Sequence, residues 1–275
     1  PTPPPPILSG LVGSEMCIRD RLSFVGGIDI SMNGGPGQLT SLFVQGSNSK
    51  HVLILVDGVA INDSATGIAA IQNINPELIN RIEIVKAPRT SLYGSQAIGG
   101  VINIFTKKNL RNSLQTGVNT GSDNTKSFNI STAMNRENIQ SGLHLSHYQT
   151  DGFPSKVGSN LDSGYENKSV QAYLQSKDEK RTIKTSVWST SGSTEYLDFF
   201  LNPISQDFDN LASTINIIKP INDQWLSSFN VNLSKDEIDQ NNSDDFNHSK
   251  KTMLEWQNSL QLSPINEMII GYIYE

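Results

Sequence analysis

The sequence predicts a compact α+β domain followed by an antiparallel β-sheet whose strands are long enough to cross a membrane. The pattern of apolar residues changes near Lys108, which divides the chain into two regions. Before this point, short β-branched runs lie among glycines, as is typical of buried strands. After it, apolar and polar residues alternate, as is typical of strands with two different faces. No run of about 18 apolar residues occurs, which excludes a helical membrane protein.

The first 21 residues differ from the rest of the chain. Residues 1–21 begin with a proline-rich run and lack the basic, apolar and small-residue layout of a secretory signal. We therefore expect an extraneous or disordered segment, such as translated adaptor sequence, although a natural disordered linker stays open as the alternative. Cys17 is the one cysteine of the chain, which excludes an internal disulfide and a cysteine-based metal site.

Residues 22–108 are expected to form the α+β domain. Its strands are predicted in HVLILVDGVAIN (51–62), RIEIVKAP (81–88) and GGVINIFTK (99–107). Between them, Asn75 offers an N-cap, Pro76 suits the first helical position, and Glu77 suits the positive end of a helix dipole. We therefore predict a short helix over PELIN, residues 76–80.

Residues 109–275 are expected to form strands of a transmembrane β-barrel. In one segment Trp225, Phe229 and Leu233 share a face, while asparagine and serine occupy the other. About nine segments show this pattern, each close to the ~9–11 residues that a tilted strand needs to cross a bilayer. A soluble antiparallel sheet with one wet face is the alternative. The polar face favours an aqueous lumen because it carries asparagine, serine, threonine and glutamine rather than lysine and glutamate.

The predicted connections between these strands are unequal. Short turns are expected at 177–181 and 220–224, and long polar connections at 150–168, 190–209 and 234–250. Short turns at one end and long loops at the other are the pattern of outer-membrane barrels.

Two motifs in order carry a family resemblance. They are NGGPGQLTSLFVQGSNSKHVLILVDGVAIN (33–62) and NPELINRIEIVKAPRTSLYGSQAIGGVINIFTKK (75–108). The first region resembles the plug domain of TonB-dependent outer-membrane receptors, within their cobalamin-receptor-like branch. A Gly-rich phosphate loop is the competing interpretation, but no Gly-Lys-Ser/Thr follows these glycines.

The resemblance implies a receptor in the outer membrane of a Gram-negative bacterium rather than an enzyme. It would take up a scarce nutrient, cobalamin or a related corrinoid, with TonB and membrane lipid as partners. A barrel of this class has about 22 strands, so we expect a piece of a longer receptor that lacks the TonB-binding segment and the later strands. A haem or siderophore receptor and a secreted β-rich adhesion or binding protein are the alternatives. The net charge of -6 argues against a nucleic-acid partner.

The resemblance also points to ligand contacts on two outward loops of the plug, 33–40 and 62–67. The candidate residues are Asn33, Gly35, Gln38, Ser64 and Thr66. Polar side chains on such loops often bind ligands, but these residue types are also those that any turn uses.

Charged residues near the RIEIVKAPRT segment are expected to join the plug to the barrel wall. The candidates are Glu83, Lys86 and Arg89, because buried charges inside a filled barrel must be paired. Lys86 stands where the family commonly has arginine, and Ala87 where it has glycine. Ordinary solvated charges are the alternative explanation.

The cobalamin-receptor-like branch further implies structural calcium on extracellular loops. Asp162, Asp198 and Asp209 are the residues that match, and solvated loop acids are the alternative. No other cofactor is expected, since no nucleophile, acid-base pair or zinc-binding spacing occurs among the histidines or elsewhere.

Overall fold

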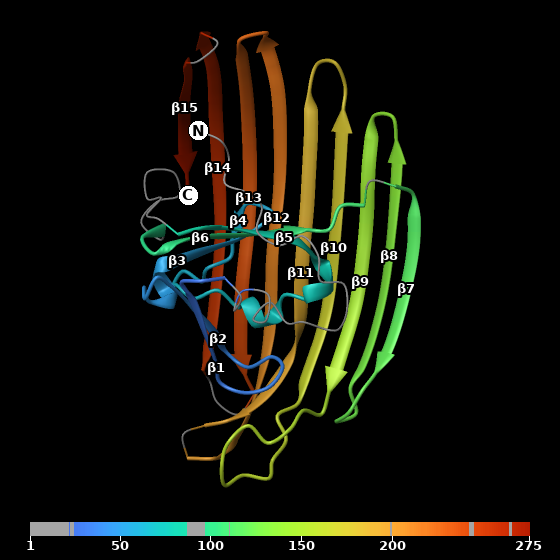
Figure 1. Cartoon of the computed structure of the whole chain (residues 1–275), viewed down its shortest axis with the longest axis vertical. Coiled ribbons are helices and arrows are strands. Elements are labelled where there is room, and N and C mark those ends of the chain that lie inside the picture. Colours follow the sequence, from blue (N-terminus) through green and yellow to red (C-terminus); the bar gives the residue numbers. More distant parts are fainter. Residues whose placement is uncertain are drawn as a thin grey trace.

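The computed structural model consists of a small mixed domain lying against a tall sheet (Figure 1). The residues that the structure describes are 22, 25–86, 97–109, 111–198, 200–241, 245–263 and 266–275. We call the described part up to Asn109 the plug, and the nine-stranded sheet that follows it the wall. Within the described residues, no helix has the length and apolar character needed to span a membrane.

The plug contains two sheets. A hairpin is formed by β1 (Ile28–Met32) and β2 (Thr40–Val44). A four-stranded sheet has the order β4-β3-β6-β5, in which β3 and β6 are parallel and the other pairs antiparallel. Its strands are β3 (Val52–Val56), β4 (Val59–Ala60), β5 (Ile79–Val85) and β6 (Gly100–Thr106), and short 3-10 helices lie at η1 (Ser49–His51), η2 (Ile71–Asn73) and η3 (Pro76–Leu78).

The predicted PELIN helix is present but shorter. Asn75 caps η3 as expected, because its Oδ1 accepts a hydrogen bond from the Glu77 backbone N–H at 2.9 Å. The helix ends at Leu78, and Ile79 already begins β5. Ile79 is 1% exposed, so burial of its side chain in the plug core decides the conformation against a longer helix.

The plug core is built around β3 and β6. All five residues of β3 are buried. Val52, Ile54 and Val56 join the main cluster, whereas Leu53 and Leu55 pack on the opposite face. Burial of both faces explains why this segment is a continuous apolar run. Burial of each such side chain contributes about 1.5–3 kcal/mol to the stability of the fold.

The wall is a meander in which each strand pairs antiparallel with the next. The nine strands agree with the predicted number. They are β7 (Ser113–Thr120), β8 (Lys126–Arg136), β9 (Ile139–Thr150), β10 (Tyr165–Lys177), β11 (Thr182–Leu197), β12 (Pro203–Asn222), β13 (Trp225–Gln240), β14 (Phe246–Ser263) and β15 (Asn266–Tyr274).

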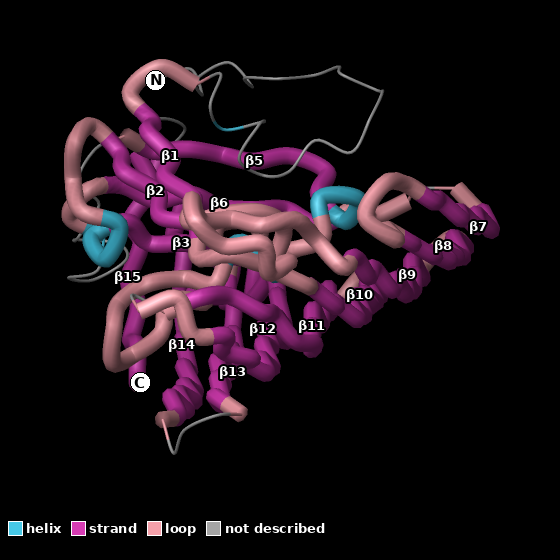
Figure 2. The backbone as a smooth tube through the Cα atoms, turned by 90° about the horizontal axis from the view of Figure 1, so that it is seen from below, coloured by secondary structure: helices cyan, strands magenta, loops and turns pink. Residues whose placement is uncertain are grey.

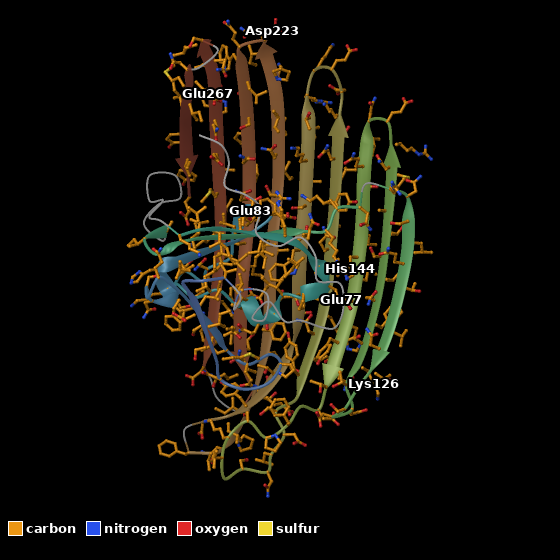
Figure 3. All side chains as sticks on the ribbon, in the orientation of Figure 1. Glu77, Glu83, Lys126, His144, Asp223 and Glu267 are labelled. Atoms are coloured by element: carbon orange, nitrogen blue, oxygen red, sulfur yellow. The ribbon has the colours of Figure 1, made fainter. Side chains whose placement is uncertain are left out.

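The two ends of the wall differ as predicted. The short connections 137–138, 178–181 and 223–224 lie at one end, the turn end, and the longer connections 121–125, 151–164 and 198–202 lie at the other, the loop end. Figure 3 labels Asp223 at the turn end and Lys126 at the loop end. In outer-membrane barrels the short turns face the periplasm.

Two of the predicted long connections were wrong. Segments 190–209 and 234–250 are mostly strand, because β11 and β12 continue to Leu197 and from Pro203, and β13 continues to Gln240. Their polar side chains bond across strands, as when Lys235 Nζ donates to Asp209 Oδ2 at 2.5 Å. Strands with polar residues on both faces lack the apolar alternation by which strands were predicted.

The burial of side chains along the wall strands confirms the predicted alternation of an apolar and a polar face. Along β10, Tyr165, Ser169 and Tyr173 are buried, whereas Val170 and Leu174 are 41% and 42% exposed. The wall curves, and the plug lies on its concave side (Figure 2). The convex face therefore carries the apolar side chains that a barrel presents to lipid.

Candidate functional site

Six inward-facing residues form one row across the wall, directly opposite one another from strand to strand. This polar row consists of Ser146, Ser169, Thr190, Asn210, Asp236 and Ser249. All except Ser146 are buried. Burial of uncharged polar groups is favourable only when they are hydrogen-bonded, so the row needs partners.

The plug supplies partners for three of these residues from one segment, residues 62–75, and wall residues supply those of Ser169, Thr190 and Asp236. Asn75 Nδ2 donates to Ser146 Oγ at 2.9 Å, and Asn73 Nδ2 donates to Asn210 Oδ1 at 2.8 Å. At the other end of the row, Ser249 Oγ donates to Ser64 Oγ at 2.9 Å. Each such bond contributes about 0.5–1.5 kcal/mol, so the plug is held by several weak contacts that can break one at a time.

Apolar contact adds to this docking on the neighbouring row. Trp188 of β11 and Ala212 of β12 are 2% and 3% exposed and belong to the same buried cluster as the plug core. The plug therefore packs directly on the middle of the wall.

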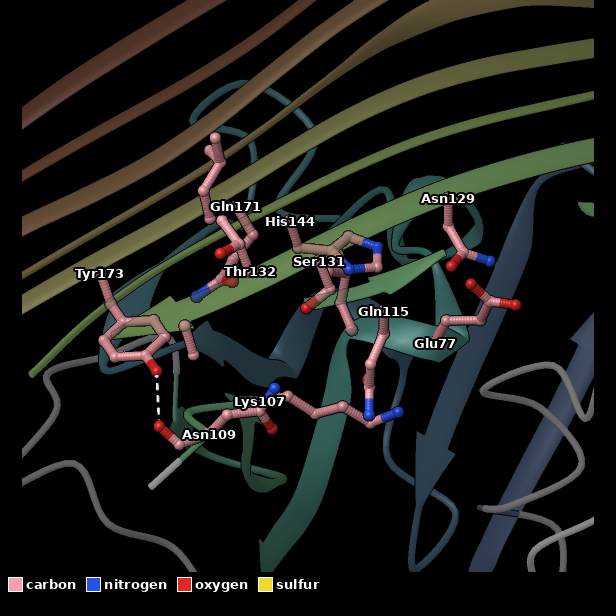
Figure 4. Close-up of a pocket in the computed structure, with 13 residues that line it drawn as sticks. Glu77, Lys107, Asn109, Gln115, Asn129, Ser131, Thr132, His144, Gln171 and Tyr173 are labelled. Atoms are coloured by element: carbon pink, nitrogen blue, oxygen red, sulfur yellow. Dashed lines mark hydrogen bonds between the residues drawn. The ribbon is translucent and has the colours of Figure 1, made fainter. Parts of the chain in front are cut away.

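A polar cavity of about 260 Å³ separates the plug from the first strands of the wall (Figure 4). From the wall it is lined by Gln115, Ser131, His144 and Gln171, which also lie opposite one another in register. The plug contributes Glu77, Leu78, Lys107 and Asn109, and the remaining lining residues are Asn129, Thr132, Ala133, Leu143 and Tyr173. At one edge, Tyr173 Oη donates to the Asn109 carbonyl at 2.9 Å. This space suits water or a small polar solute, since a water molecule occupies about 30 Å³.

The first predicted ligand loop, 33–40, is packed against the loop end of the wall. Gln38 is 5% exposed, and its Nε2 donates to the Glu195 carbonyl at 2.7 Å. A Cβ added at Gly35 would lie 3.1 Å from the Phe153 ring, which shows how closely the loop approaches connection 151–164. Asn33 is exposed beside them. Gln38 therefore anchors the loop, and Asn33 is the predicted polar contact whose side chain is left on its surface.

The second predicted loop, 62–67, reaches a different part of the wall. Ser64 and Thr66 are both exposed; Ser64 bonds to Ser249 on β14, and Thr66 bonds within the loop to Asp63. Asp63 Oδ1 shapes the loop by accepting from the Ala65 N–H at 3.1 Å, the Thr66 N–H at 2.6 Å and the Thr66 hydroxyl at 2.8 Å. The structure thus brings both loops to the wall, and their contact with a ligand stays a prediction.

The Asp63 carboxyl should keep this loop closed down to acidic pH. Burial alone would raise its pKa, but hydrogen bonds from Thr66 and Ala65, together with the polar Asn247 side chain beside the carboxylate, hold the pKa below that of an ordinary aspartate. Stability from a lowered carboxyl pKa is present above the unfolded value and is lost as the pH falls through the folded value. We expect the Thr66 amide chemical shift to titrate with a midpoint below the ordinary pKa of an aspartate side chain. A midpoint above that value would contradict the assignment.

Two of the predicted plug–wall charges, Glu83 and Lys86, have partners inside the plug. Glu83 pairs with Arg81 of the same strand at 2.8 Å, both about half exposed, and Lys86 Nζ donates to the Gly26 carbonyl inside the plug. Arg89 lies outside the described residues. The reason is that β5 is an edge strand of the plug sheet and projects Glu83 toward solvent. Short uncharged side chains make the docking contacts instead. The alternation had indicated a polar inward face, but Thr190, Asp236 and Ser249 lie in segments predicted as connections, so the row itself was missed.

Two of the predicted calcium ligands, Asp198 and Asp209, lie apart. Asp198 accepts from the Phe200 and Asn202 N–H groups in its own turn, and Asp209 pairs with Lys235. Asp209 is opposite Ser191, about six residues or roughly 20 Å along β11 from that turn. Asp162 is exposed in connection 151–164. Across the described ranges, no group of three acidic, histidine or cysteine side chains is placed to hold a metal ion. Calcium at these acids therefore stays a prediction without support from the geometry.

Comparison with known proteins decides the family. Residues 17–101 match the model of the TonB-dependent Receptor Plug Domain. This chain belongs to the TonB-dependent receptors. Receptors of this family lie in the outer membrane of Gram-negative bacteria and are not enzymes, which agrees with the expected localisation and the absence of a catalytic motif.

Relatives of this TonB-dependent receptor extend the match through the wall. The Vitamin B12 transporter BtuB of Vibrio vulnificus is 31% identical over 227 residues, which cover 79% of this chain and 36% of the relative. The chain thus spans about a third of that relative's length.

Solved structures agree with the fold. The siderophore receptor PirA from Acinetobacter baumannii has a TM-score of 0.67 at 19% identity. The matched part covers 94% of this chain and 45% of the PirA chain. The ferric yersiniabactin uptake receptor FyuA from Yersinia pestis has a TM-score of 0.68 at 14% identity. The matched part covers 92% of this chain and 44% of the FyuA chain. These likenesses show a plug with part of a receptor barrel.

Proposed function

We propose that this receptor imports cobalamin or a related corrinoid across the outer membrane, with energy supplied through TonB. The observation that carries the proposal is the similarity to the Vitamin B12 transporter BtuB, which runs through 79% of this chain. Because 227 aligned residues exceed the length of the plug, the similarity includes part of the wall. We further propose that the plug is residues 22–108 and that the barrel strands begin after residue 109.

The plug–wall contacts support a gated uptake mechanism. Ligand would bind at the loop end, where loops 33–40 and 62–67 meet the wall. Transport requires the plug to move, and the weak uncharged bonds along the polar row allow it to detach in steps. The polar cavity beside β7 to β10 would let water enter first and replace those bonds.

Ligand binding in a strain that lacks its own cobalamin receptor tests the proposal. Cells that display this receptor should bind cyanocobalamin, and Gly37→Ala should weaken binding by about tenfold or more. Gly37 has φ +73, and an added Cβ would lie 2.0 Å from the Tyr165 ring, so the loop must leave its place.

Gly46→Ala is the matched control for this experiment. Gly46 also has a positive φ, +77, but a Cβ there meets no atom within 4 Å, so the backbone strain is similar without the clash. Its cyanocobalamin affinity should stay close to that of the unaltered receptor. Binding of a ferric siderophore or haem by the unaltered receptor, without binding of cyanocobalamin, would reject the corrinoid proposal.

A further inference from the structure

Two buried carboxylates meet where the plug crosses the polar row. Asp63 is 2% exposed and Asp236 is 7% exposed. Ser64, the neighbour of Asp63, bonds to Ser249, and Ser249 lies directly opposite Asp236 in register. The Ser64–Ser249 bond and this register bring the two aspartates to the same part of the polar row. One carboxylate therefore comes from the plug and the other from the wall.

The two carboxylates do not satisfy each other. Asp63 Oδ1 takes all three donors of its loop, whereas Asp63 Oδ2 is buried without a hydrogen-bond partner, although the Asn247 side chain lies beside the carboxylate. Asp236 Oδ1 accepts from Asn210 Nδ2 at 3.0 Å. Oδ2 of Asp63 is thus the oxygen left available for a further partner.

No positive side chain balances this pair in the part of the chain that the structure describes. Lys235 is adjacent to Asp236, but successive residues of a strand point to opposite faces, and Lys235 Nζ is engaged by Asp209 and Glu237. Asp63 and Asp236 form no ion pair among the described residues. Two like charges buried without a counter-charge are strongly unfavourable.

A cation between the carboxylates would offset the repulsion between their charges and would give Asp63 Oδ2 the partner that it lacks. The other groups placed near the pair are the hydroxyls of Ser64 and Ser249. Carboxylate and hydroxyl oxygens suit a hard cation, and two carboxylates balance a divalent charge.

We propose that Asp63 and Asp236, assisted by Ser64 and Ser249, bind one divalent hard cation that bridges the plug to the wall, with Ca²⁺ as the probe. This site is separate from the loop acids Asp162, Asp198 and Asp209. Bound cation joins the 62–67 loop to β13 and β14, so its removal loosens the plug at this end of the polar row.

Calcium-dependent stability of the purified chain in detergent tests the site. After treatment with a chelator, millimolar Ca²⁺ should raise the thermal midpoint of the unaltered chain by about 4 °C or more, as expected for a ligand well above its dissociation constant. Asp236→Asn should abolish this shift and leave the chelator-treated chain as stable as the unaltered one or more stable, because the repulsion is relieved. Asp63→Asn should abolish the shift as well.

Controls separate this site from the loop acids. Asp198→Asn and Asp209→Asn should each keep the full calcium response. Direct binding of radioactive Ca²⁺ should give one ion per chain, and none in Asp236→Asn, which keeps the test valid if a variant unfolds at a different temperature. The proposal is overturned if the unaltered chain shows no calcium response, if Asp236→Asn keeps the response, or if either control loses it.

Discussion

Trp188→Ala should lower the free energy of unfolding of the docked plug by about 3–5 kcal/mol, the range for truncating a buried aromatic residue. Trp188 belongs to the wall but is 2% exposed within the plug core cluster. Its indole Nε1 has no hydrogen-bond partner, so the loss is one of packing and of the cavity left behind. We expect the urea midpoint to fall and protease cleavage within the plug to accelerate, measured on the purified chain in detergent.

Trp256→Ala is the matched control. Trp256 lies on the convex face of the wall, is 51% exposed, and donates from Nε1 to Ser227 Oγ at 3.0 Å. Removing it should leave the rate of plug cleavage unchanged, because it makes no part of the plug core cluster. Equal acceleration in both variants would show that Trp188 acts on the wall as a whole and not on docking.

Asn62→Leu should have a similarly large effect, about 3–5 kcal/mol, but inside the plug. Asn62 is 3% exposed; its Oδ1 accepts from the Ile54 N–H at 2.8 Å, and its Nδ2 donates to the Val52 and Gly67 carbonyls at 2.9 Å each. Leucine keeps a similar volume but leaves three buried backbone groups without partners, each costing about 1–3 kcal/mol. Hydrogen exchange at the Ile54 amide should accelerate together with global unfolding.

An exposed asparagine with one backbone bond serves as the comparison. Asn48 caps η1 by accepting from the Lys50 N–H at 3.2 Å and is exposed. Asn48→Leu should cost only about 0.5–1 kcal/mol and leave the Ile54 amide protected. If the two variants lose equal stability, the Asn62 bonds do not hold the 62–67 loop to β3 as described.

Much of the fold follows from local sequence. The run 52–56 is apolar throughout because β3 is buried on both faces, and the alternation in β10 and β13 follows from one lipid-facing and one inward face. The cap at Asn75 and the short turns were predicted for the same reason, since a few adjacent residues contain the required interactions. The length of the helix predicted at 76–80 was wrong, because the burial of Ile79, which ends the helix, depends on distant strands.

The candidate site was likewise predicted from the sequence only in part. The sequence by itself determined that the chain carries a receptor plug and wall strands with one polar face, because ordered motifs and period-2 alternation are local properties of the chain. Only the tertiary structure decided which inward residues meet. Ser64 and Ser249 are 185 positions apart, and their contact depends on the register of successive strand pairs and on where the plug docks. The polar row, the packing of Trp188 in the plug core and the facing carboxylates Asp63 and Asp236 all arise from that register, which no local pattern encodes.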